Sequence, residues 1–206
     1  MAQSVQHENQ KYTYADYLTW PEDERWELID GEPYCMSPAP TPRHQIILVS
    51  LVLQVGNFLK GKPCQLFPAP FDVRFVERDL SDQETLTVVQ PDISVICDPQ
   101  KIDERGCKGA PDFIVEIVSP SSVQRDLIKK TALYEKYGVR EYWVIHPVDQ
   151  ILTVYVQDEA TQKFGAAHLQ VTQGRRAVAT LPGLEINLDE VMGASAQNDG
   201  TQGAVS

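Results

Sequence analysis

Residues 113–118 read Phe113-Ile114-Val115-Glu116-Ile117-Val118, a nearly continuous apolar run in the middle of the chain. A short run of this kind fits a central strand that is buried on both faces of a sheet. Ser119-Pro120-Ser121-Ser122 ends the run and offers capping residues for a helix that continues to Tyr137 and stops at Gly138. We therefore predict a strand–helix unit here, followed by two more strands over residues 141–145 and 151–156.

The N-terminal half predicts a short helix, a hairpin and one long helix. Thr13 and Asp16 resemble a capping box for the short helix, and the Asp30-Gly31 pair predicts a hairpin between residues 25–29 and 32–36. Thr41 and Pro42 fit the N-cap and first residue of a helix that runs to about residue 60. Apolar residues occupy nearly every face of that helix, so we expect it to be buried, against a sheet or a second subunit.

Further extended segments complete the predicted domain. Residues 72–76 alternate, residues 86–89 and 92–97 form one β segment interrupted by Pro91, and residues 163–171 form a last strand. These elements predict one α/β domain over residues 12–192, with a mixed β-sheet flanked by helices. Residues 1–11 are polar and residues 193–206 are rich in small and polar types, so both ends are expected to be flexible.

Composition limits the classes of function. The 206-residue chain is 42% hydrophobic, has no apolar run near the roughly 20 residues of a membrane helix and lacks a signal-peptide pattern. We therefore expect a soluble, cytoplasmic protein without membrane contact, whose 4 widely spaced cysteines are reduced thiols. The net charge of −11 argues against a broad basic surface for nucleic acid, although a local basic groove remains compatible with it.

Two carboxylates stand in unusual places. Asp92 follows Pro91 in an otherwise apolar β segment, and Glu116 interrupts the central apolar run. An ionised carboxylate in such surroundings is unfavourable unless it is paired or binds a metal. The two residues are therefore candidates for a functional site, and the alternative is that each pairs with a nearby cation or faces solvent at a sheet edge.

Lys130 is the third candidate. Val123, Leu127, Thr131 and Tyr134 recur at helical spacing, and Lys130 lies on that inward stripe whereas Lys129 points about 100° away. Alternatively, Lys130 extends from the edge of the stripe or pairs with Asp126 one turn earlier. On the sequence alone, Lys130→Met is expected to leave the fold intact, because Met keeps the apolar stem and removes a desolvated charge.

Together these residues predict phosphodiester chemistry. Two carboxylates can bind a hard divalent cation such as Mg²⁺ or Mn²⁺ through oxygen. Such a cation activates water and polarises a phosphoryl oxygen, and a neighbouring lysine can orient the water or stabilise the developing negative charge. We therefore expect Asp92 and Glu116 to be metal ligands and Lys130 to be catalytic.

Several ordered segments resemble one known family. They are residues 26–32 (WELIDGE), 91–95 (PDISV), 111–120 (PDFIVEIVSP), 130–134 (KTALY) and 138–145 (GVREYWVI). In this order they resemble the Uma2 family, which belongs to the PD-(D/E)XK restriction-endonuclease-like superfamily. The resemblance covers residues 12–192 and implies a restriction-endonuclease-like core and a metal-dependent endonuclease that acts on DNA. The alternative is a catalytically inactive nucleic-acid-binding or assembly module that retains the fold.

The resemblance also assigns residues. It makes Asp92 and Glu116 the acidic pair, and it makes Lys130 the catalytic lysine, moved to the helix because Val118 occupies the superfamily's usual lysine position. Glu27 becomes an accessory catalytic acid, for which the alternative is an exposed hairpin glutamate, and Asp72 is a weaker candidate of the same kind. His44, at the start of the long helix, is expected to face solvent, and the alternative is that it contacts substrate.

A homodimer is expected on two grounds. The long helix has more apolar surface than one sheet face can cover, and the family resemblance points the same way.

Overall fold

The computed structural model describes residues 11–21, 23–36, 40–76, 80–118 and 123–193, with only the backbone for residues 123–127. The predicted flexible ends therefore lie almost wholly outside the described residues. The chain begins with the short helix α1 (Tyr14–Tyr17), whose capping box between Thr13 and Asp16 is present. The predicted hairpin follows as β1 (Trp26–Ile29) and β2 (Glu32–Cys35), with positive φ at Asp30 and Gly31 in its turn.

Strand β9 (Phe113–Ile117) lies inside a mixed sheet, which we call the central sheet. Its order is β12-β11-β10-β9-β6-β3; β9 runs parallel to β10 and antiparallel to β6. The other strands are β3 (Gln65–Pro68), β6 (Ile93–Ile96), β10 (Glu141–His146), β11 (Ile151–Val156) and β12 (His168–Val171). The prediction of a buried central strand in a mixed sheet flanked by helices is therefore confirmed.

A second sheet, the N-terminal sheet, contains the hairpin and several short strands. Its order is β2-β1-β5-β4-β8-β7, with β4 (Val73–Arg74), β5 (Val88–Val89), β7 (Ile102–Asp103) and β8 (Gly106–Lys108). Residues 86–97 were predicted as one β segment, but β5 and β6 belong to different sheets. The chain crosses between the sheets at residues 90–92, where Pro91 cannot donate a ladder hydrogen bond.

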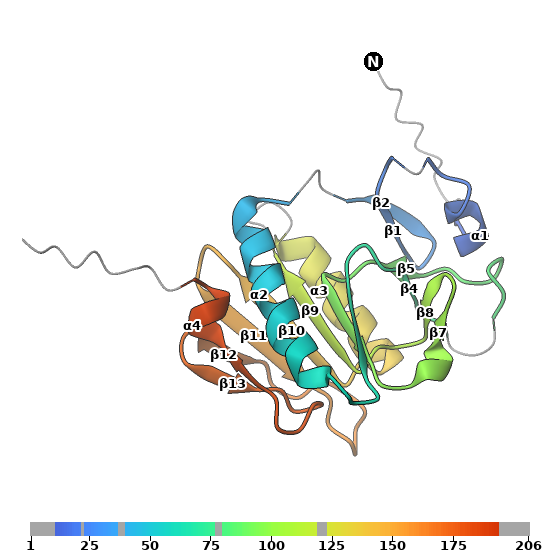
Figure 1. Cartoon of the computed structure of the whole chain (residues 1–206). Helices are drawn as coiled ribbons and strands as arrows, with labels where there is room; N and C mark the ends of the chain where they lie inside the picture. The colour runs from blue at the N-terminus through green and yellow to red at the C-terminus, as the bar shows by residue number, and fades with distance from the viewer. Residues whose placement is uncertain (1–10, 22, 37–39, 77–79, 119–122, 194–206) are drawn as a thin grey trace, which may run out of the picture.

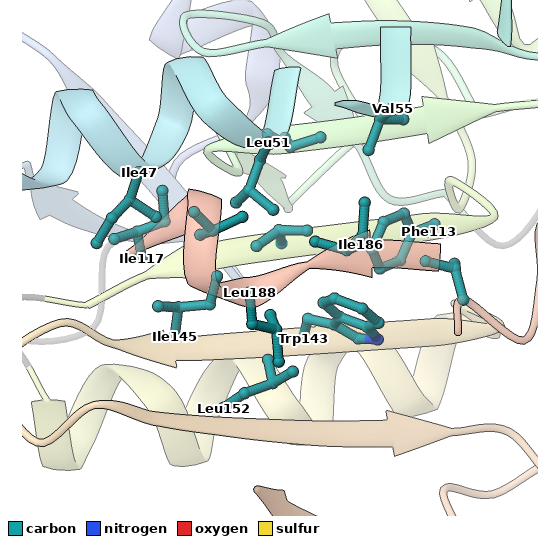
Figure 2. Packing of buried hydrophobic residues seen from close by; sticks show 14 of the residues in the cluster. Ile47, Leu51, Val55, Phe113, Ile117, Trp143, Ile145, Leu152, Ile186 and Leu188 are labelled. Carbon is teal, nitrogen blue, oxygen red and sulfur yellow. The ribbon is translucent and has the colours of Figure 1, made fainter. Parts of the chain in front are cut away.

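Helices α2 (Pro42–Leu59) and α3 (Val123–Tyr137) cover opposite faces of the central sheet (Figure 1). Alternation along β9 decides which side chains meet which helix: Phe113, Val115 and Ile117 pack with α2, whereas Ile114 packs with Leu133 and Tyr134 of α3. Figure 2 shows the α2 side of this core around Trp143. Glu116 shares the face of Ile114, so the fold directs this carboxylate toward α3.

The long helix is buried on one face only, which corrects the prediction. Ile47, Leu51 and Val55 are buried on the sheet, but Ile46, Val49 and Leu53 are 54%, 53% and 60% exposed. One face of a sheet can cover only one stripe of side chains along a helix that packs on it. The chain therefore presents an apolar stripe on the outer face of α2.

The expectation that all cysteines are reduced is also wrong. Cys64 and Cys97 form a disulfide, whereas Cys35 is exposed and free and Cys107 is buried and free. The register of β3 with β6 pairs Gln65 with Ile96. The next residues outward, Cys64 and Cys97, therefore face each other at the sheet edge, a contact that their spacing in the sequence does not reveal.

The C-terminal part differs from the single strand predicted over residues 163–171. Only residues 168–171 join the central sheet, as β12, while Phe164 forms an isolated bridge with Gln157. A small ribbon, β13 (Arg175–Ala177) with β14 (Glu185–Asn187), and helix α4 (Leu188–Val191) then pack on the α2 side of the core. In the part of the chain that the structure describes, no helix is long and apolar enough to cross a membrane.

Candidate active site

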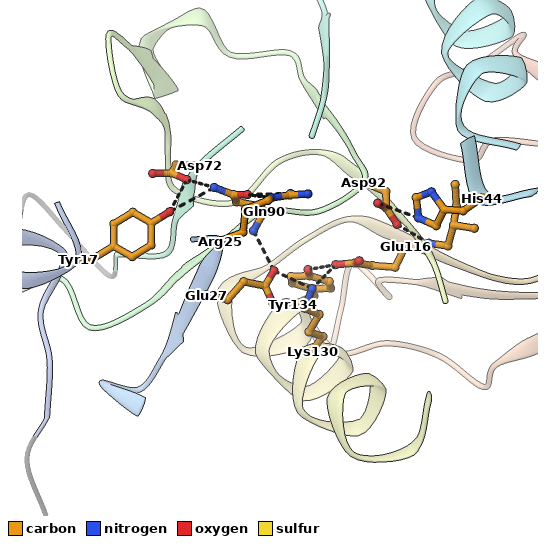
Figure 3. A network of polar contacts seen from close by, with 11 residues as sticks. Tyr17, Arg25, Glu27, His44, Asp72, Gln90, Asp92, Glu116, Lys130 and Tyr134 are labelled. Atoms are coloured by element: carbon orange, nitrogen blue, oxygen red, sulfur yellow. Dashed lines mark hydrogen bonds and ion pairs between the residues drawn. The ribbon is translucent and has the colours of Figure 1, made fainter. Parts of the chain in front are cut away.

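Asp92 and Glu116 face each other where the central sheet meets the N-terminal sheet. Ile93 of β6 pairs with Val115 of β9, so Asp92, one residue before β6, lies opposite Glu116. Residues opposite each other on antiparallel strands project to the same face. The two residues therefore lie opposite each other in the sheet, close enough for the charge of Asp92 to act on the Glu116 carboxyl (Figure 3).

Lys130 reaches this pair from α3. Its Nζ lies 2.8 Å from Glu27 Oε1 and 2.9 Å from Glu116 Oε1, and its side chain is only 11% exposed. Lys129 instead contacts Tyr34 and Glu32 and is 38% exposed. The inward position of Lys130 is thus confirmed and the edge alternative is wrong; the side chains of Val123, Asp126 and Leu127 lie outside the described residues.

Glu27 is buried, so the exposed-hairpin alternative is wrong for this residue. Its Oε1 accepts hydrogen bonds from Lys130 Nζ and from the backbone N–H of Gln90, at 2.8 and 2.9 Å. Because Gln90 lies in the crossing between the sheets, this carboxylate ties β1, the crossing and α3 together.

Asp72 belongs to a neighbouring network instead. It accepts hydrogen bonds from the hydroxyls of Tyr14 and Tyr17 and from the side chain of Gln90. Gln90 is therefore the link between Asp72 and Glu27, and the hydrogen bonds of Asp72 lie in this neighbouring network.

The buried charges shift one another's protonation. Burial raises the pKa of the Glu116 carboxyl to about 7, the nearby Lys130 ammonium opposes this rise, and the charges of Asp92 and Glu27 add to it. Burial by itself would lower the pKa of Lys130, but the charges of Glu116 and Glu27 outweigh it and raise that pKa above its usual value. Lys130 is therefore an ammonium group at neutral pH, unable to act as a base.

Tyr134 completes the surroundings of Glu116. Its hydroxyl donates a 2.6 Å hydrogen bond to Oε1, the oxygen that Lys130 also contacts. Burial, together with the charge of Glu116, raises the pKa of Tyr134 well above its usual value, so the hydroxyl keeps its proton. Among the residues that the structure describes, none forms a hydrogen bond or ion pair with the other oxygen, Oε2.

The chain is similar to known proteins over most of its length. Residues 14–189 match the model of the Uma2 family, which is described as "Putative restriction endonuclease". The chain belongs to the Uma2 family. A solved structure from Anabaena variabilis, described as "a putative nuclease belonging to DUF820", superposes with a TM-score of 0.67 at 23% identity, covering 88% of this chain and 97% of that chain. This likeness shows the restriction-endonuclease-like fold.

An uncharacterized protein of Synechocystis is also similar. It is 30% identical over 126 residues, which span 60% of this chain and 62% of the relative. The match therefore covers less than two thirds of that protein's length.

The donor set of this Uma2 site fits a hard divalent cation. Asp92 and Glu116 offer carboxylate oxygens from opposite positions of neighbouring strands, and Oε2 of Glu116 is not used by the described residues. Within the described part of the chain, no group of three or more His, Cys, Asp and Glu residues is arranged to hold a metal. Two carboxylates nevertheless suffice for Mg²⁺, which usually keeps several waters and binds to one or two carboxylates together with substrate phosphates.

Sequence reasoning missed the contacts of Tyr134 and His44 with the carboxylates of the Uma2 site. His44 does not face solvent: its Nε2 lies 3.2 Å from Asp92 Oδ1, and its side chain is 16% exposed. Burial lowers the pKa of the imidazole, but the hydrogen bond and charge of Asp92 outweigh this and raise it. The signal available in the sequence was a histidine in the first turn of a helix, which does not say what that turn lies against.

Proposed function

We propose that this chain is a metal-dependent endonuclease that hydrolyses phosphodiester bonds of DNA. The observation that carries the proposal is the contact of Lys130 with Glu116 at 2.9 Å, beside Asp92 in the register of β6 and β9. A buried cation and two adjacent carboxylates, supplied by separate elements, form an arrangement suited to phosphoryl transfer. The family description supports the same chemistry.

The charges of the site favour a divalent cation. Ionised Glu27, Asp92 and Glu116 contribute −3 and Lys130 contributes +1, so these four groups carry −2. A phosphodiester, itself anionic, would be repelled by this charge unless a cation compensates for it. Asp92 and Glu116 would hold Mg²⁺ or Mn²⁺. When bound, such an ion lowers the pKa of a coordinated water and polarises a phosphoryl oxygen.

Lys130 would then stabilise negative charge in the reaction. Since its ammonium stays protonated, it can donate hydrogen bonds and stabilise negative charge on the phosphoryl oxygens, but it cannot remove a proton from water. Glu27 is a positioning residue in this scheme, because its carboxylate fixes the Lys130 ammonium next to Glu116. Tyr134 orients the Glu116 carboxylate through Oε1, leaving Oε2 for the cation.

Positive side chains near the site favour a nucleic-acid substrate despite the net charge of −11. Arg25 is exposed and donates to Gln90, whose backbone N–H contacts Glu27. Lys129 lies on α3 next to Lys130. Cations placed this way can contact phosphates on either side of a scissile bond.

Cleavage of plasmid DNA with Mg²⁺ or Mn²⁺ tests the proposal. We expect the parent to cleave, and Asp92→Asn and Glu116→Gln to lose at least about 100-fold in rate. Asp98→Asn is the matched control, because Asp98 is exposed at the opposite end of the same strand and Asn preserves its capping role. Equal cleavage by Asp92→Asn and the parent would contradict the assignment. A parent that binds Mn²⁺ without cleaving DNA would favour the inactive binding or assembly module.

We also propose that the chain forms a homodimer through the outer stripe of α2. Ile46, Val49 and Leu53 recur on one face of this helix, and each is more than half exposed. A second copy would cover this stripe. A two-fold dimer would then carry two sites, which suits a duplex with two antiparallel strands.

A further inference from the structure

His44, in the first turn of α2, contacts Asp92 of the carboxylate pair. Its Nε2 lies 3.2 Å from Asp92 Oδ1 (Figure 3). A carboxylate only accepts hydrogen bonds, so Nε2 carries a hydrogen and donates it. Asp92 Oδ2 in turn accepts the backbone N–H of Ile117 at 2.7 Å. The carboxylate is therefore fixed by two donors, one on each oxygen.

The second ring nitrogen of His44 shows that burial of the imidazole does not by itself stabilise the protein. Nδ1 of His44 is buried and has no hydrogen-bond partner within the described residues. A buried polar atom without a partner costs free energy that an apolar side chain at this position would avoid. The contact with Asp92 is thus the polar interaction that compensates for the burial of the ring.

The helix that carries His44 is itself held rigidly. Thr41 caps it by accepting the backbone N–H of His44 at 3.2 Å, and Ile47 and Leu51 are buried on the central sheet in the following turns. A ring on a rigidly held helix can keep its hydrogen-bond partner in a fixed orientation.

We propose that His44 is a positioning residue that orients the Asp92 carboxylate for cation binding. The inference rests on the proposed metal-dependent function. Partners that hydrogen-bond to ligating groups typically change metal affinity by about 10- to 100-fold when they are removed. His44 does this without being a ligand itself.

Mn²⁺ binding to the full-length protein, measured by calorimetry, tests this without an activity assay. His44→Leu removes the donor and should weaken Mn²⁺ binding about 10- to 100-fold. His44→Gln places an amide N–H near the position of Nε2 and should recover most of the loss. Gln45→Leu, an exposed change in the same helical turn, is the matched control and should bind like the parent.

The outcomes separate this inference from the proposed function. If the parent binds Mn²⁺ and His44→Leu binds it equally well, the positioning role is overturned and the metal site stands. If the parent binds no Mn²⁺, both the proposed metal site and the proposed role of His44 are refuted. Should His44→Leu not fold, His44→Asn replaces it, because its shorter amide does not reach Asp92. Equal affinity of the Asn and Gln variants would then overturn the inference.

Discussion

Lys130 lies between two carboxylates, and this position links the stability of the protein to the proposed chemistry. Glu27 and Glu116 come from different sheets and are both buried. Each is stabilised as an anion by the same ammonium, at 2.8 and 2.9 Å. A residue with two buried partners cannot be replaced without leaving both of them uncompensated.

Lys130→Met is therefore expected to destabilise the protein, contrary to the expectation from sequence alone. The free energy of unfolding at pH 8 should fall by about 3–5 kcal/mol, because two buried carboxylates lose their counter-ion. Lys129→Met should change it by less than about 1 kcal/mol, as is usual for exposed ion pairs. Urea unfolding of both variants checks this, and equal stability of the parent and Lys130→Met would refute it.

Glu116 should make stability depend on pH in an unusual direction. Its pKa is about 7 in the folded protein against 4.5 as its ordinary value, so between these values the folded state binds more protons than the unfolded state. Its contribution to stability is therefore fully present below pH 4.5 and is lost as the pH rises through 7.

Comparison with Glu116→Gln isolates this effect. Relative to that variant, the parent should lose up to about 3 kcal/mol of unfolding free energy between pH 5 and pH 8 in the absence of divalent cations. Denaturant unfolding at the two pH values measures the difference. A stability difference that does not change with pH would show that burial does not raise this pKa.

At the scale of elements, β10 connects the central sheet to the C-terminal segment through a buried acid. Glu141 is fully buried and accepts hydrogen bonds from Trp143 Nε1 and from the backbone N–H and hydroxyl of Thr180. These contacts fix the turn between β13 and β14 against the core. The carboxylate is thus explained by structure and needs no role in the site.

Glu141→Ala should lower the free energy of unfolding by about 3 kcal/mol, because it leaves buried donors without an acceptor. Cleavage and Mn²⁺ binding by the folded variant should remain at parental levels. Glu185→Ala, an exposed position on β14, should change stability by less than about 0.5 kcal/mol. Thermal unfolding of both variants tests the prediction, and a small effect at Glu141 would contradict it.

For the whole molecule, the exposed stripe on α2 lies on the same helix as His44. The N-terminal turn of α2 contacts Asp92, while its outer face presents Ile46, Val49 and Leu53. Association through this stripe would therefore hold each site at a fixed place relative to the dimer axis.

Light scattering at micromolar concentration should give about twice the 23.1 kDa mass of the chain. Leu53→Lys should give the monomer mass, because it places a charge within the apolar contact. Gln83→Lys, an exposed change outside α2, should remain dimeric. A parent that scatters as a monomer would rule the dimer out.

Local patterns in the sequence determined the main elements and three of the site residues. Some features depend only on residues that are neighbours in the sequence, so they can be predicted from it. They are the apolar run of β9, the Asp30-Gly31 turn and the caps of α1 and α2. Asp92 and Glu116 stood out because each is a charge in an apolar context, and Lys130 because of its helical phase.

Tertiary structure alone decided the rest. Four features depend on which distant segment of the chain packs against the residue concerned. They are the burial of Glu27, the contact of His44 with Asp92, the Cys64–Cys97 disulfide and the exposed side of α2. Lys130 and Glu27, for example, are 103 residues apart. Hydrophobic periodicity reports that a face is to be buried, but it carries no information about the partner that buries it, because apolar contact is non-directional.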